Sequence, residues 1–199
     1  MTASSRLSEY TARTPIRVEF YTRSYHASGD IEVARWHVAD VMNDKVRPFL
    51  LMENSVREPL GPAPQVGGEA LARATEYLQL AKAAVVLAIP HDNPQHALAR
   101  QQYLAALYEE RAQVEAIVIV PPFELRGTIH LRRAFQIKNA LEELPNEFIP
   151  ITDMEAVYIP DARLKINAEF AVVNRPLAEM FALVDEGPMK KIARGFRSS

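Results

Sequence analysis

Five histidines are the side chains of this 199-residue chain best suited to bind a metal or to transfer protons, and they lie at positions 26, 37, 91, 96 and 130. His91 and His96 form the only local pair, and Pro94 lies between them. Residues five apart do not share one face of a helix, and this spacing is not typical of metal sites. We therefore expect no metal site, and we interpret the histidines as structural or solvent-exposed.

Paired carboxylates do not indicate an acid–base site either. Glu109-Glu110 and Glu142-Glu143 are adjacent in predicted helices, where neighbouring side chains point in different directions. The chain contains no glycine-rich phosphate-binding loop, no G-x-S-x-G nucleophile elbow and no cysteine. We expect no catalytic residue and no cofactor, and this favours a non-enzymatic protein.

Basic residues near two predicted short helices are a candidate binding surface. These residues are Arg35, Lys45, Arg132, Arg133 and Lys138. They would form one basic stripe if the two halves of the chain were related by approximate two-fold symmetry. The alternative is a set of scattered surface charges balanced by neighbouring acidic residues, which fits the formal net charge of −2.

The C-terminal segment is a second candidate binding surface. Its apolar residues recur at helical spacing, and the charges between them are all positive. The candidate partner-binding residues are Met189, Lys190, Lys191, Ile192, Arg194 and Phe196. A basic amphipathic segment of this kind can dock on a groove of a partner or on an acidic surface, and a frayed terminus is the alternative.

Two periodicities locate the elements that would position these residues. Residues 16–22 and 29–33 alternate apolar and polar side chains, which predicts a pair of strands. Residues 36–44 and 135–144 have apolar side chains at helical spacing, which predicts two short helices.

A longer helix is predicted over residues 94–114. Asn93 is a favourable N-cap, and proline is favourable at the first helical position, which Pro94 occupies. This helix would connect the two halves of the chain.

The order of the elements occurs twice along the chain. The matching pairs are Gly29/Gly127, Trp36/Phe135, Phe49/Phe148, Leu78/Leu164 and Pro90/Pro176. Their separation is 98 residues at the glycines, 99 at the phenylalanines and 86 at the last two pairs, so 99 − 86 = 13 residues are inserted into the first copy. The turn-rich segment 59–68 is where we place this insertion. The alternative to a duplication is chance similarity between β-rich stretches.

The predicted fold class is α+β. It is a tandem duplication of a small antiparallel β module with about five strands and one short internal helix per copy, able to close into a small barrel, with a long connecting helix. The predicted boundaries are a flexible tail at 1–14, module one at 15–92, the connecting helix at 93–114, module two at 115–187 and the basic tail at 188–199.

Composition indicates a soluble globular protein, with 48% hydrophobic and 24% charged residues. The longest apolar run, residues 83–90, is far below the ~20 residues needed to span a membrane. The N-terminus has no apolar segment typical of a secretory signal. We therefore predict a cytoplasmic protein with no membrane span.

Two features of each copy resemble motifs of Sm-like barrels. One is the glycine at the start of the second strand, Gly29 or Gly127, and the other is the closing aliphatic hairpin. The chain departs from that fold because it has a predicted helix between the second and third strands and lacks a glycine in the last bend. It resembles more closely a group of short uncharacterised bacterial β-rich domains, in two tandem copies. The resemblance covers residues 16–56, 75–90, 115–155 and 161–176.

Three functions are compatible with these observations. The first is a non-catalytic interaction or assembly protein that binds a protein partner or itself, because small β modules expose strand edges. The second, implied by the Sm-like resemblance, is binding of nucleic acid or nucleotides. The third is an enzyme with a site between the modules, for which the sequence nominates no residue. We rank them in this order.

Overall fold

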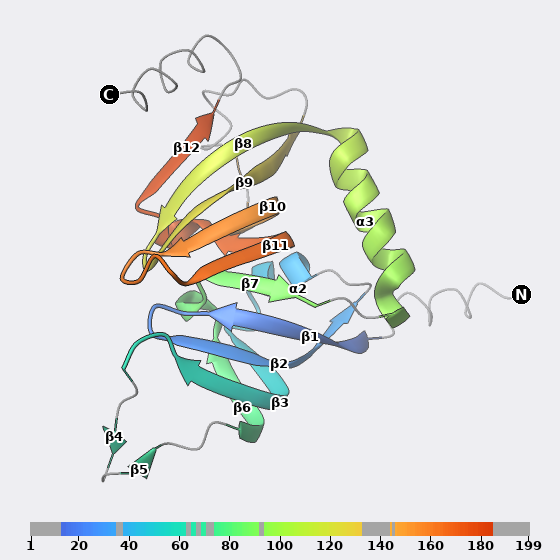
Figure 1. The fold of residues 1–199 in the computed structure, drawn as a ribbon. Coiled ribbons are helices and arrows are strands. Elements are labelled where there is room, and N and C mark those ends of the chain that lie inside the picture. The colour runs from blue at the N-terminus through green and yellow to red at the C-terminus, as the bar shows by residue number, and fades with distance from the viewer. Residues whose placement is uncertain are drawn as a thin grey trace, which may run out of the picture.

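A computed structural model describes residues 13–34, 38–62, 65–66, 69–70, 74–91, 94–132, 144 and 146–184. The first half contains β1 (Arg13–Tyr21), β2 (Tyr25–Ala34), α2 (Val38–Asn43), β3 (Phe49–Pro59), β6 (Ala74–Ala81), the 3₁₀ turn η1 (Lys82–Ala84) and β7 (Leu87–Pro90). A small hairpin of β4 (Gln65–Val66) and β5 (Glu69–Ala70) projects from it (Figure 1).

The second half begins after the 3₁₀ turn η2 (Pro94–His96) and the helix α3 (Ala97–Glu110). It contains β8 (Arg111–Val120), β9 (Phe123–Arg132), β10 (Phe148–Tyr158), β11 (Lys165–Asn174), the 3₁₀ turn η3 (Arg175–Leu177) and β12 (Met180–Val184). Among the described residues, no helix is long and apolar enough to cross a membrane.

The described strands other than β4 and β5 form a single ten-stranded antiparallel sheet (Figure 1). Its order is β12-β8-β9-β10-β11-β7-β1-β2-β3-β6. We call β7, β1, β2, β3 and β6 the first run, and β12, β8, β9, β10 and β11 the second run. The predicted α+β fold of two modules joined by a long helix is therefore wrong, because the described part of the chain is mostly β and the two runs share one sheet.

The two runs join where β7 pairs with β11. Ala88 lies opposite Val172, Leu87 lies opposite Val173, and the Asn174 N–H donates to the Val86 carbonyl at 3.0 Å. A strand at the edge of a sheet leaves backbone groups unpaired, so pairing these two edges satisfies both. We call this contact the joint.

The connecting helix is shorter than the predicted 93–114. Helix α3 ends at Glu110, and residues 111–114 already belong to β8. The reason lies in the alternation of β8, where Val114, Ala116 and Val118 are buried while their neighbours face outward. The predicted helix over 36–44 is present as α2, whereas 135–144 lies outside the described residues except for Leu144.

The two runs use the same hydrogen-bond register. Ala81 lies opposite Phe49 in the first run, as Asn174 lies opposite Phe148 in the second. We call residues that share a register position in the two runs matching positions, so Ala81 matches Asn174. The predicted pairings of Leu78 with Leu164 and of Pro90 with Pro176 are therefore wrong. The two prolines differ in role, because Pro90 ends β7 whereas Pro176 lies within η3.

The matching glycines sit where the next strand comes too close for a side chain. A Cβ on Gly29 would lie 2.8 Å from Met52 Cε, and one on Gly127 would lie 2.8 Å from Ile151 Cγ1. In both runs the neighbouring strand is irregular at this point.

Buried apolar side chains form two clusters that interlock at the joint. The cluster under the first run includes Phe148, Phe170 and Val172 from the second run. The cluster under the second run includes Tyr21 and Leu87 from the first run. Each core is therefore completed by side chains from the other run.

Candidate functional site

The end of the sheet formed by β3 and β6 exposes large apolar side chains. Along β3, Leu50 and Met52 point into the core, so Phe49 and Leu51 point away from it. They are 50% and 60% exposed, and Tyr77 on β6 is 57% exposed. Tyr77 lies opposite Glu53, and residues directly opposite each other share one face of a sheet. We call Phe49, Leu51 and Tyr77 the edge patch.

The edge patch borders an open strand. Within the described residues, β6 is the last strand of the sheet and has β3 as its only strand neighbour. Native proteins usually protect such edges with charged residues or proline, but β6 carries only one charge, Glu76. A cluster of exposed apolar residues beside an open edge is typical of a surface that binds another protein.

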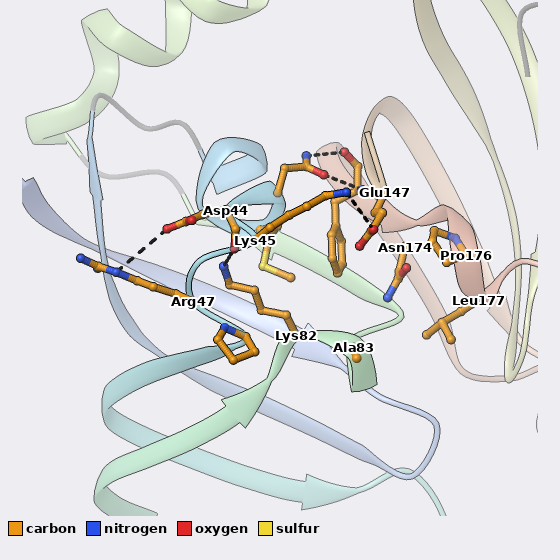
Figure 2. A pocket seen from close by; sticks show the side chains of 13 residues that line it. Asp44, Lys45, Arg47, Lys82, Ala83, Glu147, Asn174, Pro176 and Leu177 are labelled. Carbon is orange, nitrogen blue, oxygen red and sulfur yellow. Dashed lines mark hydrogen bonds and ion pairs between the residues drawn. The ribbon is translucent and has the colours of Figure 1, made fainter. Parts of the chain in front are cut away.

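A hollow of about 330 Å³ lies beside the joint (Figure 2). Its lining includes Lys82, whose ammonium group donates to the carbonyl oxygens of Val41 and, at 2.8 Å, of Asp44. These carbonyls lie at the C-terminal end of α2, where helices leave oxygens without partners. Burial lowers the pKa of Lys82. By donating hydrogen bonds to these two carbonyl oxygens, Lys82 stabilises the C-terminal end of α2.

Amide side chains close the joint next to this hollow. Asn43 Nδ2 donates to the Phe148 carbonyl at 2.7 Å, and the Phe148 N–H donates to Asn43 Oδ1 at 2.9 Å. Asn43 thus makes the two bonds that a neighbouring strand would make. Asn174 Nδ2 donates to the Val85 carbonyl at 2.8 Å, which links the two runs a second time.

The charged groups of the hollow also have partners. Lys45 Nζ lies 3.4 Å from Glu147 Oε1, and Arg47 Nε lies 4.0 Å from Asp44 Oδ2, as Figure 2 shows. Asn43, Asn174 and Lys45 therefore connect the two halves of the chain at the hollow, whereas Lys82 and Arg47 contact residues of the first half. We make no enzymatic proposal for the hollow.

A cluster around Glu19 escaped the sequence analysis. The Tyr21 hydroxyl donates to Glu19 Oε2 at 2.7 Å, and His91 Nε2 lies 2.7 Å from Glu19 Oε1. His26 Nε2 lies 3.3 Å from Glu19 Oε2 and is stacked on the Tyr21 ring. The contact with His26 is the main cause that lowers the pKa of Glu19 to about 2.

Part of this cluster could have been predicted. Glu19 and Tyr21 are two residues apart in a predicted strand, so they share one face, and the hairpin register places His26 opposite Tyr21. His91 reaches the cluster only because β7 pairs with β1. A carboxylate with a pKa near 2 is a weak base at neutral pH, and a catalytic base needs a pKa near the working pH. Within the described residues, no group of three or more His, Cys, Asp or Glu side chains, this cluster included, is arranged so that it could hold a metal ion.

His130 is a buried histidine whose tautomer follows from its partners. Its Nδ1 lies 3.0 Å from the Leu107 carbonyl, which can only accept, so Nδ1 carries the proton. Its Nε2 therefore accepts from the Thr152 hydroxyl at 2.9 Å. Burial lowers the pKa of His130. His130 thus connects α3 to the sheet, and His96 Nε2 similarly contacts Thr14 Oγ1 at 3.0 Å.

The candidate binding residues of the sequence are only partly within the described chain. Lys45 is exposed and pairs with Glu147, and Arg132 is the last residue of β9. The other members of the stripe, Arg35, Arg133 and Lys138, lie outside the described residues, as do His37 and the tail residues of 189–196. Comparison of the chain with protein-family models, curated proteins and solved structures finds no match, so its site is interpreted from its own geometry.

Proposed function

We propose that this chain is a cytoplasmic, non-catalytic interaction or assembly protein that binds a protein through the edge patch. The observation that carries the proposal is the exposure of Phe49, Leu51 and Tyr77 beside the open edge of β6. An extended segment of a partner could add to this edge, with backbone hydrogen bonds for affinity and the apolar side chains for specificity.

The edge patch is large enough to contribute useful binding energy. Fully burying a large apolar side chain stabilises by about 1.5–3 kcal/mol. Because the three side chains are roughly half exposed, covering them would contribute about 3–4 kcal/mol in total. Backbone hydrogen bonds along β6 would add to this value.

Nucleic-acid binding, the alternative from the sequence, is not proposed, because no observation on the described residues favours it. Phosphate binding needs basic side chains that are available to the ligand. Among the described basic residues, Arg17 lies 3.5 Å from Asp30, and Arg126 pairs with Glu115. These pairs reduce the positive potential of the surface.

Site-specific photo-crosslinking tests the proposal. A photoreactive amino acid replaces Tyr77 in the full chain, which is expressed in its own cells and irradiated there. The matched control places the same amino acid at Leu98, which is also exposed but lies on α3. We expect protein adducts from position 77 and not from position 98. No adduct at position 77, or equal adducts at both positions, would refute the proposal.

A further inference from the structure

We propose that the protein assembles head to tail, with β12 of one molecule pairing antiparallel with β6 of the next. This inference rests on the proposed function, because it identifies the partner of the edge patch as a second copy of the chain. We infer the geometry of this contact from the joint, where β7 pairs with β11 inside the molecule.

The strand β12, at one end of the sheet, occupies the same position in the second run as β7 occupies in the first run. Each strand follows a 3₁₀ turn, and each pairs with the first strand of its own run. Leu87 lies opposite Tyr21, and its matching residue Met180 lies opposite Ile119. The residue before each is held in the same way, since the Val86 N–H donates to the Tyr21 carbonyl at 2.7 Å and the Glu179 N–H donates to the Ile119 carbonyl at 2.8 Å.

The strand β6, at the other end of the sheet, occupies the same position in the first run as β11 occupies in the second run. Both strands pair with the third long strand of their run, and Ala81 matches Asn174. The Asn174 N–H points away from β10 and donates to the Val86 carbonyl at the joint. By the shared register, the Ala81 N–H points out of the open edge, where the carbonyl of Glu179 from a second molecule can accept it.

The residues that are buried around the joint have large apolar counterparts at the matching positions of the two ends of the sheet. Phe148 and Phe170 are 3% and 4% exposed at the joint, and their matching residues Phe49 and Tyr77 are 50% and 57% exposed. On the opposite strand, Leu87 is fully buried, whereas its matching residue Met180 is 59% exposed. Each end therefore has large apolar side chains at the positions that the joint buries, and no strand of the described residues covers them.

Within the described residues, the two end strands carry few of the features that prevent pairing with another strand. The five residues of β12 include no charged residue and no proline, and β6 includes only Glu76. Transferring the register of the joint places Met180 opposite Leu80 and Phe181 opposite Gln79 in the contact between molecules. This contact puts no two like charges opposite each other.

The positions of the two edges determine the kind of assembly. β12 and β6 lie at opposite ends of the sheet, and Figure 1 shows them at opposite ends of the molecule. Two different surfaces meet in such a contact, so the growing assembly again ends in one β12 and one β6 that have no second strand neighbour among the described residues. A contact of this type produces a ring when its rotation closes and an open chain when it does not.

Complementation between two variants tests the inference. Tyr77→Lys disables β6 and leaves β12 intact, whereas Met180→Lys disables β12 and leaves β6 intact. Sedimentation velocity across the micromolar range should show concentration-dependent assembly of the wild type and an association at least 10-fold weaker for each variant. An equimolar mixture should form a 1:1 complex that grows no further. Leu98→Lys is the matched control and should assemble like the wild type.

A gain of function provides a second test. Asn174 adds a side-chain hydrogen bond to Val85 at the joint, and β6 has alanine at the matching position. Ala81→Asn should restore this bond between molecules and tighten association roughly 5-fold, the equivalent of one net hydrogen bond of about 1 kcal/mol. A weaker or unchanged association would contradict the proposed register.

The remaining outcomes separate the inference from the proposed function. A wild type that stays monomeric throughout the range would overturn the inference, as would a mixture of the two variants that fails to form dimers while the wild type assembles. Circular dichroism of each variant verifies that it is folded, and Gln79→Lys is a second exposed β6 variant.

A monomeric wild type whose position 77 still crosslinks to another protein would leave the proposed function standing, whereas the absence of any adduct would refute both the proposed function and the inference.

Discussion

Replacing Asn43 by alanine should destabilise the protein by weakening the joint. Asn43 belongs to α2, yet its amide pairs with both backbone groups of Phe148, which is 105 residues away along the chain. No other described side chain reproduces the pairing of a strand with these two groups. We call the two hydrogen bonds between the Asn43 amide and the Phe148 backbone the latch. The variant tests whether the latch stabilises the contact between the two runs in addition to their shared core.

The expected cost follows from the burial of Phe148. The alanine variant leaves the N–H and the carbonyl of a buried residue without their partner, and each unsatisfied group costs about 1–3 kcal/mol. The adjacent hollow of about 330 Å³ can admit water to this point, so the lower part of the range applies. We expect a loss of about 2–3 kcal/mol in the free energy of unfolding.

Asn43→Asp is the sharper variant. It keeps an oxygen that can accept from the Phe148 N–H, but it places a second oxygen against the carbonyls of Phe148 and Ala39, where the wild type has a donor. At neutral pH it should therefore be at least as unstable as Asn43→Ala, and it should recover stability when acid protonates the new carboxylate.

Urea denaturation followed by circular dichroism measures both effects. Val46→Ala, an exposed position just beyond α2, is the control and should change the free energy of unfolding by less than about 0.5 kcal/mol. If Asn43→Ala is as stable as this control, or if Asn43→Asp is as stable as the wild type at neutral pH, the latch contributes nothing and the reasoning is wrong.

Three further predictions concern buried groups away from the joint. Glu19 has a folded pKa of about 2, below its ordinary 4.5, so its contribution is present above about pH 4.5 and is lost as the pH falls towards 2. Urea titrations should therefore show a flatter stability profile for Glu19→Gln than for the wild type over this interval. Because burial lowers the folded pKa of His130 below its ordinary 6.5, the wild type should lose stability as the pH falls below about 6.5, and His130→Asn should show a smaller slope in the same assay. Gly127→Ala should cost about 1–3 kcal/mol, and more than Gly29→Ala, because its new methyl meets the branched Ile151 instead of a flexible methionine end. Equal thermal shifts for the two glycine variants would contradict this ranking.

The local elements were predictable because their signals are local. The alternation in residues 16–22 reports that one face of β1 is buried, and the helical spacing after residue 36 reports the buried side of α2. The joint has no such signal. All four residues of β7 are buried, because the strand lies between two cores and is covered on both faces, and a continuous apolar run does not indicate which strands it joins.

The candidate site was hidden for a related reason. Phe49 and Phe148 are the same residue type in the same position of equivalent strands, yet one is exposed and the other buried. The difference comes from the presence of a neighbouring run, which is a property of tertiary structure. Likewise His91 joins the Glu19 cluster across 72 residues, and its place in the sequence contains no trace of that contact.

The contact between molecules should be weaker than the joint that it imitates. Asn174 anchors the joint with a buried side-chain hydrogen bond, and Ala81 cannot make the matching bond at the open edge. The joint also connects parts of one chain, so its strands meet without the loss of translational freedom that two separate molecules incur on binding. The same register therefore serves two purposes. Inside the chain it makes a permanent connection, and in the assembly that we propose it makes a reversible contact whose occupancy depends on protein concentration.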